Sequence, residues 1–174
     1  MRPVFALVAL SVLLAAPAAI AKAPAAHVYR IARVVDGDTV YLTNGAKIRL
    51  VQIDTPEVYF GAECWGHQAS AETSRLLPVG TLVRLAREWA TDSVDRYGRL
   101  LRYVFRVRDG LNVNVFLVRH GDAAPYFYAG REGHYAGVLK RAALRARLHH
   151  RGLWGACRHV PVSFDRGVDT GPAT

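Results

Sequence analysis

Two turn signals close together near the start of the chain constrain its fold more than any other feature. Asn44-Gly45 is the strongest hairpin turn sequence in the chain, and Asp36-Gly37-Asp38 precedes it. The segments around these turns, 27–35, 39–42 and 47–53, are rich in β-branched, aromatic and other apolar residues. Two tight turns between three such segments predict three antiparallel strands.

Apolar patterning indicates further elements downstream of these strands. Residues 67–77 have a helical pattern and are followed by Pro78, which ends the helix. Two more strands are expected at 81–86 and 99–107, on either side of a polar stretch. Five strands with a helix between the third and fourth, followed by two more helices, predict an α+β fold. We expect a five-stranded OB-type β-barrel with three helices.

The last two of these helices follow the fifth strand. Asn112 or Asn114 can cap the first of them, which would end at Gly121, and the second occupies about 135–150. The second helix has one apolar face, and its basic residues lie off that face at Lys140, Arg141, Arg145 and Arg147. Such a charged outer face is usually only solvated, although it could touch nucleic acid.

The two ends of the chain differ in composition from the segment between them. Residues 1–21 have the charged start, apolar run and small-residue cleavage site of a secretory signal peptide, although the sequence leaves an uncleaved form open. Residues 22–26 are expected to be a flexible leader, 27–157 a single domain, and 158–174 a disordered tail of Pro, Gly and small polar residues. The protein should therefore be secreted or periplasmic, without stable membrane association after cleavage.

The chain is strongly basic. Its formal net charge is +9, and cleavage of the signal would remove one arginine and no acid, leaving +8. Arginine far outnumbers lysine, which favours a polyanionic partner because the guanidinium fork matches two phosphate oxygens at once. Charge alone fits general solubility at least as well.

The only two cysteines, Cys64 and Cys157, lie far apart in the sequence. In a chain with an export signal, a lone pair predicts one disulfide. Closing a loop of that length is worth roughly 4 kcal/mol in the chain-entropy model. Neither cysteine has a second cysteine at ligand spacing, which argues against zinc.

Polar residues that suit one chemical site come from three separate segments. The stretch 49–57 begins as a strand and then delivers Asp54, Thr55, Pro56 and Glu57 within four positions. A solvated turn uses the same residue types, so this stretch does not decide the matter alone. If the first hairpin brings Asp38 beside Asp54, two carboxylates and the Thr55 carbonyl make an oxygen-only site suited to Ca²⁺ or Mg²⁺. Asp36 is expected to tie its own turn together.

Two arginines and one acid complete this hypothesis. Arg49 and Arg99 would clamp a phosphate from two sides, while Glu57 could orient or deprotonate a water molecule. Arg49 and Asp54 are an odd number of positions apart and would face opposite sides of a straight strand. The chain must therefore bend by Asp54, and the following Thr55-Pro56 is compatible with such a bend.

At these residues the sequence closely resembles the thermonuclease family, the secreted staphylococcal-nuclease-like enzymes. The resemblance covers about residues 28 to 157, with the motifs in the same order. The matching runs are 35–40, 49–57, 95–99, 113–114 with 117–121, and 152–154.

The resemblance implies a role for each matched residue in a Ca²⁺-dependent phosphodiesterase. The metal ligands would be the carboxylates of Asp38 and Asp54 and the carbonyl of Thr55. Glu57 would act on the attacking water, as general base or as orienting acceptor, and Arg49 with Arg99 would neutralise charge at the scissile phosphate.

The resemblance also implies contacts to the substrate. Arg96 and Tyr97 would hold a terminal phosphate, and Tyr126 and Tyr128 would flank the nucleotide, one by hydrogen bonding and one by stacking. The family cleaves DNA and RNA and leaves 3′-phosphate ends. The sequence does not tell which nucleic acid is preferred, and we expect a monomer with no protein partner.

Two departures from the family pattern limit this transfer. A shorter, aromatic segment with Cys64 replaces the Lys-rich loop that follows Glu57 in the best-known member, and Pro125 could displace Tyr126 and Tyr128. The rival hypothesis is a non-catalytic OB module that binds single-stranded nucleic acid. A module kept only for binding has no reason to retain both the acids and the paired arginines.

Overall fold

The computed structural model of the protein describes residues 27–59, 61–160 and 163–173. The predicted signal peptide, 1–21, and the leader, 22–26, lie outside these residues. No helix in the described part is both long and apolar enough to cross a membrane.

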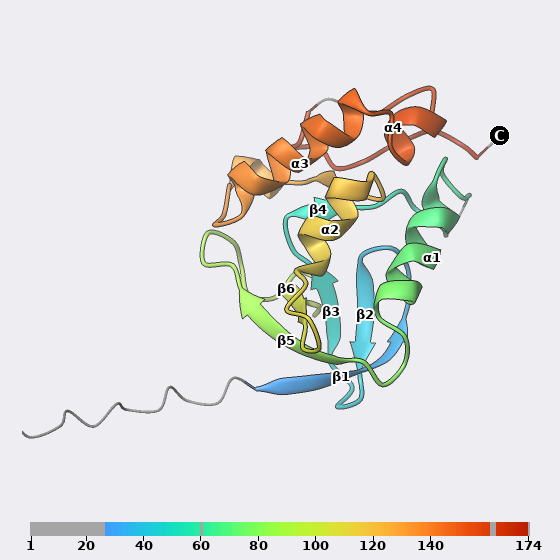
Figure 1. Ribbon diagram of the computed structural model, residues 1–174. Coiled ribbons are helices and arrows are strands. Elements are labelled where there is room, and N and C mark those ends of the chain that lie inside the picture. The colour runs from blue at the N-terminus through green and yellow to red at the C-terminus, as the bar shows by residue number, and fades with distance from the viewer. Residues whose placement is uncertain (1–26, 60, 161–162, 174) are drawn as a thin grey trace, which may run out of the picture.

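Five strands close into a barrel in the order β1-β2-β3-β6-β5 (Figure 1). β1, β2 and β3 pair antiparallel through the two turns predicted from sequence, whereas β3 and β6 pair in parallel. This confirms the predicted OB-type barrel. The strands are β1 Val28–Val34, β2 Thr39–Leu42, β3 Lys47–Leu50, β5 Leu82–Arg87 and β6 Leu100–Arg106.

The three predicted helices are present, and α3 lies across one end of the barrel (Figure 1). Smaller elements that the sequence did not predict join them: a two-stranded sheet of β4 and β7, the short helix α4 and the 3-10 turn η1. A strand of two residues is too short to show a periodic pattern, and its partner strand is distant in the chain. The bounds are β4 Ile53–Asp54, α1 Gly66–Leu76, α2 Val113–His120, β7 Ala124–Pro125, η1 Tyr128–Gly130, α3 Ala136–Leu148 and α4 Leu153–Ala156.

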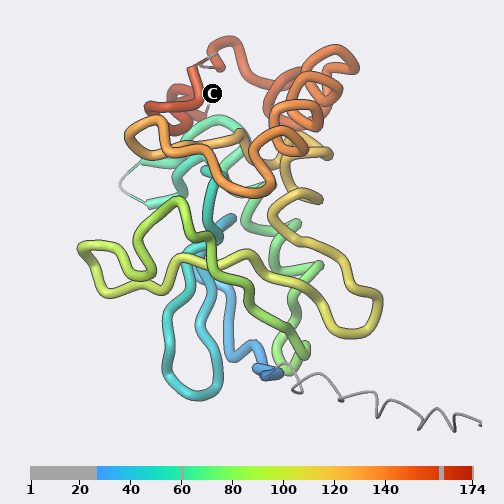
Figure 2. Tube along the Cα trace, turned by 90° about the vertical axis from the view of Figure 1, so that its left-hand side faces the viewer, coloured from blue at the N-terminus to red at the C-terminus, as the bar shows by residue number. Residues whose placement is uncertain are grey.

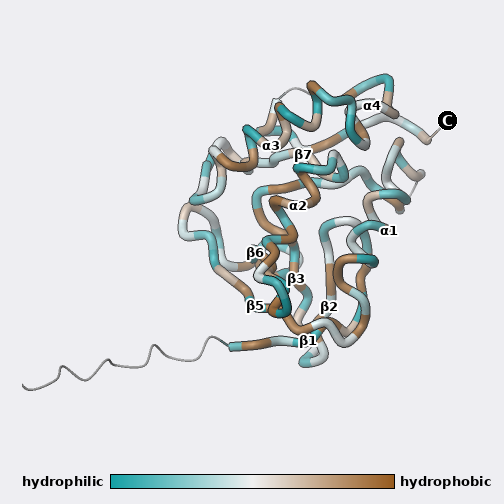
Figure 3. Tube along the Cα trace, viewed as in Figure 1, coloured by the Kyte–Doolittle hydropathy of each residue, from teal (hydrophilic) through white to brown (hydrophobic). Residues whose placement is uncertain are grey.

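The core fills the barrel and continues under the helices. In β3 the alternating residues Ile48 and Leu50 are fully buried, which turns Arg49 to the outside of the barrel. α2 and α3 cover this core with apolar side chains such as Leu117 and Leu139. Figure 3 shows the hydrophobic segments gathered in the strands and α2.

The sequence offered two asparagines at the start of α2 as the helix cap, and the structure gives them different roles. Asn112 is the helix cap, because its side chain accepts a hydrogen bond from the Val115 amide at 3.2 Å. Asn114 is fully buried, accepts from the Val104 amide at 3.0 Å and donates to the Val51 carbonyl at 2.9 Å. Asn114 therefore ties β6 to the turn that follows β3.

The described part of the C-terminal segment, 158–160 and 163–173, differs from the disordered tail expected from its composition. Phe164 accepts a hydrogen bond from the Phe127 amide at 2.7 Å, and Val168 and Thr170 are buried. The segment runs at the same end of the barrel as α3 (Figure 2). Backbone pairing with distant loops makes most of these contacts, and composition carries no sign of such pairing.

The predicted disulfide between Cys64 and Cys157 is confirmed, with a Cα–Cα distance of 5.8 Å. Cys64 also pairs with the C-terminal segment, since its amide donates to the Gly171 carbonyl at 2.8 Å and its carbonyl accepts from the Thr170 hydroxyl at 2.7 Å. The disulfide therefore joins the loop before α1 to the residue after α4, and the hydrogen bonds of Cys64 attach the C-terminal segment to the same place.

Candidate active site

A sharp bend after β3 brings Arg49 and Asp54 to the same side of the chain. The bend that the sequence requires by Asp54 is present, and it lies at Gln52, which has a left-handed backbone with φ of 63°. Partly buried hydrogen bonds hold this strained residue: its side chain donates to the Arg131 carbonyl at 2.7 Å and accepts from the Gly133 amide at 2.8 Å.

Arg49 lies between the two predicted metal ligands. Its Nε pairs with Asp38 Oδ1 at 3.0 Å, and its Nη2 contacts Asp54 Oδ1. Its third nitrogen, Nη1, donates to the carbonyls of Leu50 and Ile53, both at 2.8 Å. One largely buried guanidinium thus fixes the spacing of two carboxylates from different loops.

The first hairpin turn packs directly against Thr55. Asp38 Oδ2 accepts hydrogen bonds from the Thr55 amide at 3.0 Å and hydroxyl at 3.1 Å. A Cβ on Gly37 would lie 2.5 Å from that hydroxyl, so only glycine fits there. Asp36 accepts from the Asp38 amide at 3.1 Å, which confirms its role in the turn.

The acids of this cluster outnumber its buried cation, and their titration reflects this. Burial raises the pKa of Asp54 to about 7, against the attraction of Arg49 and with the repulsion of Asp38. Burial and the charge of Asp38 likewise raise the pKa of Asp36 to about 6. Burial would lower the pKa of Arg49, but its carboxylate neighbours outweigh this and raise it. The cluster has room in its charge balance for a further cation.

Glu57 stands at the exposed edge of this cluster. Burial is the first cause that raises its pKa above the usual 4.5, followed by the charge of Asp38. Its amide donates to Glu63 Oε2 at 3.1 Å, and its carbonyl accepts from the Glu63 amide at 2.9 Å. Its carboxylate accepts no hydrogen bond from the part of the chain that the structure describes, which leaves it available to a water molecule.

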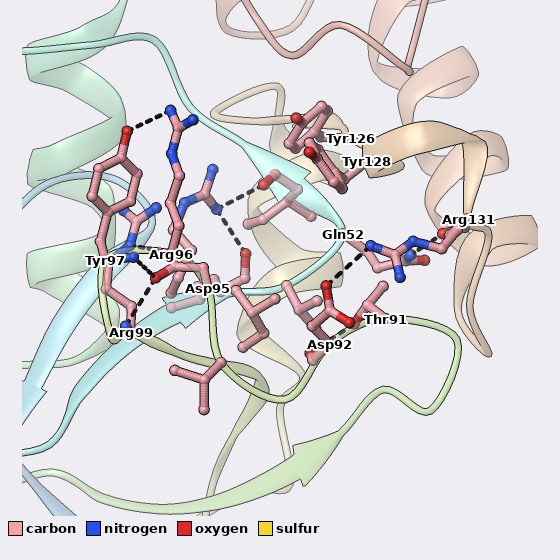
Figure 4. A pocket seen from close by; sticks show the side chains of 16 residues that line it. Gln52, Thr91, Asp92, Asp95, Arg96, Tyr97, Arg99, Tyr126, Tyr128 and Arg131 are labelled. Atoms are coloured by element: carbon pink, nitrogen blue, oxygen red, sulfur yellow. Dashed lines mark hydrogen bonds and ion pairs between the residues drawn. The ribbon is translucent and has the colours of Figure 1, made fainter.

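A pocket of about 370 Å³ opens beside the cluster (Figure 4). Arg49 and Arg99 both line it, as the sequence predicted, although they come from β3 and from the loop before β6. Asp95 holds Arg99 in place, with Oδ2 accepting from Nε at 2.6 Å and Oδ1 from the backbone amide at 2.9 Å.

The four predicted substrate-binding residues also line this pocket. Arg96 donates to the Tyr97 hydroxyl at 2.6 Å, at one side of the opening in Figure 4. The rings of Tyr126 and Tyr128 lie on the other side, with centroids 6.4 Å apart and near-perpendicular planes. Pro125 belongs to β7 and pairs with Ile53, so it places the tyrosines next to β4.

Sequence reasoning missed several residues of the site. Arg131 lines the pocket and pairs with Asp92 at 3.2 Å, and the amide of Val168 donates to Asp54 Oδ2 at 2.7 Å. Gly167, with φ of 81°, packs so closely that a Cβ would lie 2.7 Å from Asp54 Oδ2. None of these residues stands in a recognisable motif, and only their place in the fold reveals them.

The donor set of the cluster fits a hard divalent cation. The described residues contain no group of three or more His, Cys, Asp or Glu side chains that could hold a metal. Asp38, Asp54 and the Thr55 carbonyl supply two carboxylates and a backbone oxygen, a set that Ca²⁺ or Mg²⁺ completes with water. Arg49 contacts both carboxylates, so binding of a cation would rearrange these ion pairs.

Comparisons with known proteins agree with this geometry. The family model described as staphylococcal nuclease homologue matches residues 47–156. An uncharacterized endonuclease of Escherichia coli O157:H7 is 36% identical over 135 residues, which are 76% of this chain and 80% of the relative. A thermonuclease of Staphylococcus hyicus is 30% identical over 132 residues, covering 72% of this chain and 75% of that protein. Endonuclease YncB of Bacillus subtilis is 30% identical over 135 residues, or 74% and 62% of the two chains.

The barrel, the site and these matches define the class of the protein as a phosphodiester-hydrolysing endonuclease. The chain belongs to the staphylococcal nuclease homologue family. This confirms the family and enzyme class predicted from the sequence. The role of each site residue stays a prediction.

Proposed function

We propose that the mature chain is an exported, Ca²⁺-dependent nuclease that hydrolyses DNA and RNA and leaves 3′-phosphate ends. The observation that carries this proposal is the meeting of Arg49 and Arg99, from distant segments, in one pocket beside the paired carboxylates of Asp38 and Asp54. A phosphodiester in this pocket would meet two guanidinium groups that are already held in position.

The arginines are proposed to stabilise charge on the phosphate. Asp95 fixes Arg99, so this group need not reorganise as negative charge develops on the equatorial oxygens, whereas a bound cation would release Arg49 from the acid pair toward the phosphate. Removing one such donor typically lowers turnover by about 10² to 10³.

Glu57 is proposed to act on water. The water oxygen attacks phosphorus while its proton passes to the Glu57 carboxylate, the bond from phosphorus to the 5′-oxygen breaks, and the leaving oxygen takes up a proton from solvent. The phosphate then remains on the 3′ side. The free Glu57 carboxylate at the edge of the cluster suits this role, and proton transfer by a placed group is typically worth about 10² to 10⁴ in rate.

The remaining site residues are proposed to hold metal and substrate. Bound at Asp38, Asp54 and the Thr55 carbonyl, Ca²⁺ would supply Lewis-acid polarisation of a phosphate oxygen. Tyr126 and Tyr128 offer a hydroxyl and a ring face to the nucleotide. Arg96 and Tyr97, joined at the opposite side of the opening, would hold a terminal phosphate.

Substitutions of Glu57 and Arg99 test these roles. Glu57→Gln and Arg99→Ala should each lower turnover of DNA by at least about 10² while thermal melting stays near wild type. Arg99→Lys should recover only part of the loss, because an ammonium keeps the charge but not the planar fork. Arg84→Ala, on the exposed outer side of β5, is the matched control and should keep full activity. Near-full turnover in folded Glu57→Gln would remove Glu57 from the mechanism.

Export is tested separately on secreted material. Intact-mass measurement should find an N-terminus near Lys22, and thiol labelling should find no free cysteine, since Cys64 and Cys157 are joined. A chain that retains residues 1–21 would contradict the proposed cleavage.

A further inference from the structure

A second recess lies on the helical side of the molecule, outside the candidate active site. It has a volume of about 450 Å³ and a floor of Val138 and Ala142 from α3. No residue lines both this recess and the pocket that holds Arg49 and Arg99. The residues around its floor are all basic: Arg119, Arg141, Arg145, His149 and Arg151.

The four arginines of this basic recess are exposed and come from three segments. Arg119 lies in the last turn of α2, Arg141 and Arg145 lie in α3, and Arg151 follows that helix. Within the described ranges none of the four forms an ion pair with a carboxylate. This contrasts with Arg49 and Arg99 of the candidate active site, which are held by Asp38, Asp54 and Asp95.

Helix dipoles account for only part of this charge. The C-termini of α2 and α3 each present roughly half a unit of negative charge, and arginines in the last turns compensate it. Two such termini offset about one of four guanidinium charges. The rest repel one another across the recess, an arrangement that an anion relieves and solvent only screens.

We propose that the basic recess is a second phosphate-binding site, which holds the backbone of a nucleic acid beyond the nucleotides in the catalytic pocket. This inference rests on the proposed nuclease function, because it assigns the same substrate class to a new surface. Arg141 and Arg145 stand one helical turn apart, about 6 Å along the axis, so they contact successive phosphates. Contacts of this kind position the substrate without reading its sequence.

A membrane surface is the other polyanion that basic helices bind. Leu144 and Leu148 are exposed on the outer side of α3, 57% and 67%, close to the same arginines. The arginines favour nucleic acid because they converge from α2, α3 and the following segment around a hollow. A flat lipid surface would be met by a row of cations along one helix, with a larger apolar stripe.

The test compares two double variants that lose the same charge. Arg141→Gln/Arg145→Gln removes two arginines of the recess, whereas Arg84→Gln/Arg147→Gln removes two exposed arginines outside it. Binding to a labelled DNA duplex is measured by fluorescence anisotropy over a series of salt concentrations. A chelator is present so that the DNA is not cleaved during the measurement. Losing two phosphate contacts should reduce the slope of log K against log salt by about 1.8. The control pair should keep the wild-type slope.

Kinetics supply a second readout. The recess variant should hydrolyse a dinucleotide as fast as wild type, because that substrate ends within the catalytic pocket, and should show a raised KM only for long DNA. Equal salt slopes for the two double variants would overturn the recess proposal while leaving the nuclease proposal intact. Absence of cleavage by wild type, with the slope difference present, would instead sink the nuclease proposal.

Binding to vesicles of phosphatidylglycerol and phosphatidylcholine tests whether the surface binds membranes instead of nucleic acid. We expect Leu144→Ser/Leu148→Ser to bind DNA and vesicles as wild type does. If that variant lost vesicle binding and the recess variant kept the wild-type DNA slope, the surface would bind membranes and the proposal would be wrong.

Discussion

The backbone amide of Val168 donates a 2.7 Å hydrogen bond to Asp54 Oδ2, across a sequence separation of 114 residues. Asp54 therefore has one oxygen on Arg49 and the other on the C-terminal segment. Because this bond favours the charged carboxylate, it lowers a pKa that burial has raised. The end of the chain is thus part of the environment of a proposed metal ligand.

Removal of residues 163–174 should destabilise the protein. The truncated chain loses the bonds of Phe164, Val168, Thr170 and Gly171, each worth about 0.5 to 1.5 kcal/mol net. Urea unfolding should show a lower midpoint, and the free energy of unfolding should fall by roughly 2 kcal/mol or more. Val168→Ala, which keeps the amide, is the control and should lose far less. An unchanged midpoint in the truncated chain would show that this segment does not hold the site.

Replacement of Gln52 should separate backbone strain from anchoring. Gln52→Ala keeps the strain of φ 63° and loses both side-chain hydrogen bonds, so it should destabilise by about 2 kcal/mol. Gln52→Gly loses the same bonds but removes a left-handed strain of about 1 to 2 kcal/mol. Denaturant unfolding should therefore rank wild type first, then glycine, then alanine. Alanine more stable than glycine would mean that the bend carries no strain.

Acid stability should depend on Glu88, a buried acid at the end of β5. Burial would raise its pKa, but hydrogen bonds from the Ala90 and His134 amides and the Tyr103 hydroxyl outweigh this and hold the pKa below 4.5. A lowered pKa gives stability that is full above 4.5 and is lost as pH falls through the folded-state value. As the pH falls below about 4.5, melting temperatures of wild type should fall more than those of Glu88→Gln. Parallel curves for the two proteins would refute this role.

Reduction of the disulfide should cost more than the loss of any single hydrogen bond. The bond spans 93 residues, and closing such a loop is worth roughly 4 kcal/mol in the chain-entropy model. A reductant should lower the urea midpoint of wild type to that of Cys64→Ser/Cys157→Ser. The double variant should be insensitive to the reductant, and a wild type equally insensitive would contradict the prediction.

Most of the barrel could be predicted because its signals are local. Asn44-Gly45 and the first hairpin turn specify the pairing of three strands, and Gly121 ends α2 with φ of 80° as expected. The parallel pairing of β3 with β6, the β4–β7 sheet and the course of the C-terminal segment depend on tertiary contacts. The side chains of residues 163–173 do not indicate which segments they pack against, since their hydrogen bonds are made largely by the backbone.

Site residues could be predicted where their chemical type and motif indicated a role. They could not be predicted where only their position in the fold brings them to the site. Arg49 contacts Asp38 and Asp54, and Arg99 lines the same pocket as Arg49. The bend before Asp54 was expected, but its position at Gln52 was not, because glutamine has no preference for a left-handed backbone and its anchors lie about eighty residues away. Arg131 and Val168 were not predicted because only tertiary contacts bring them to the site.

The most direct test of the nuclease account is incubation of purified mature protein with plasmid DNA and with RNA, in Ca²⁺ or in a chelator. The account predicts cleavage of both in Ca²⁺, with 3′-phosphate ends on the products, and loss of cleavage in the chelator. Asp54→Ala should remove most of the Ca²⁺-dependent activity and weaken Ca²⁺ binding in calorimetry while the protein stays folded. Undiminished cleavage in the chelator, or no cleavage by folded wild type under either condition, would contradict it.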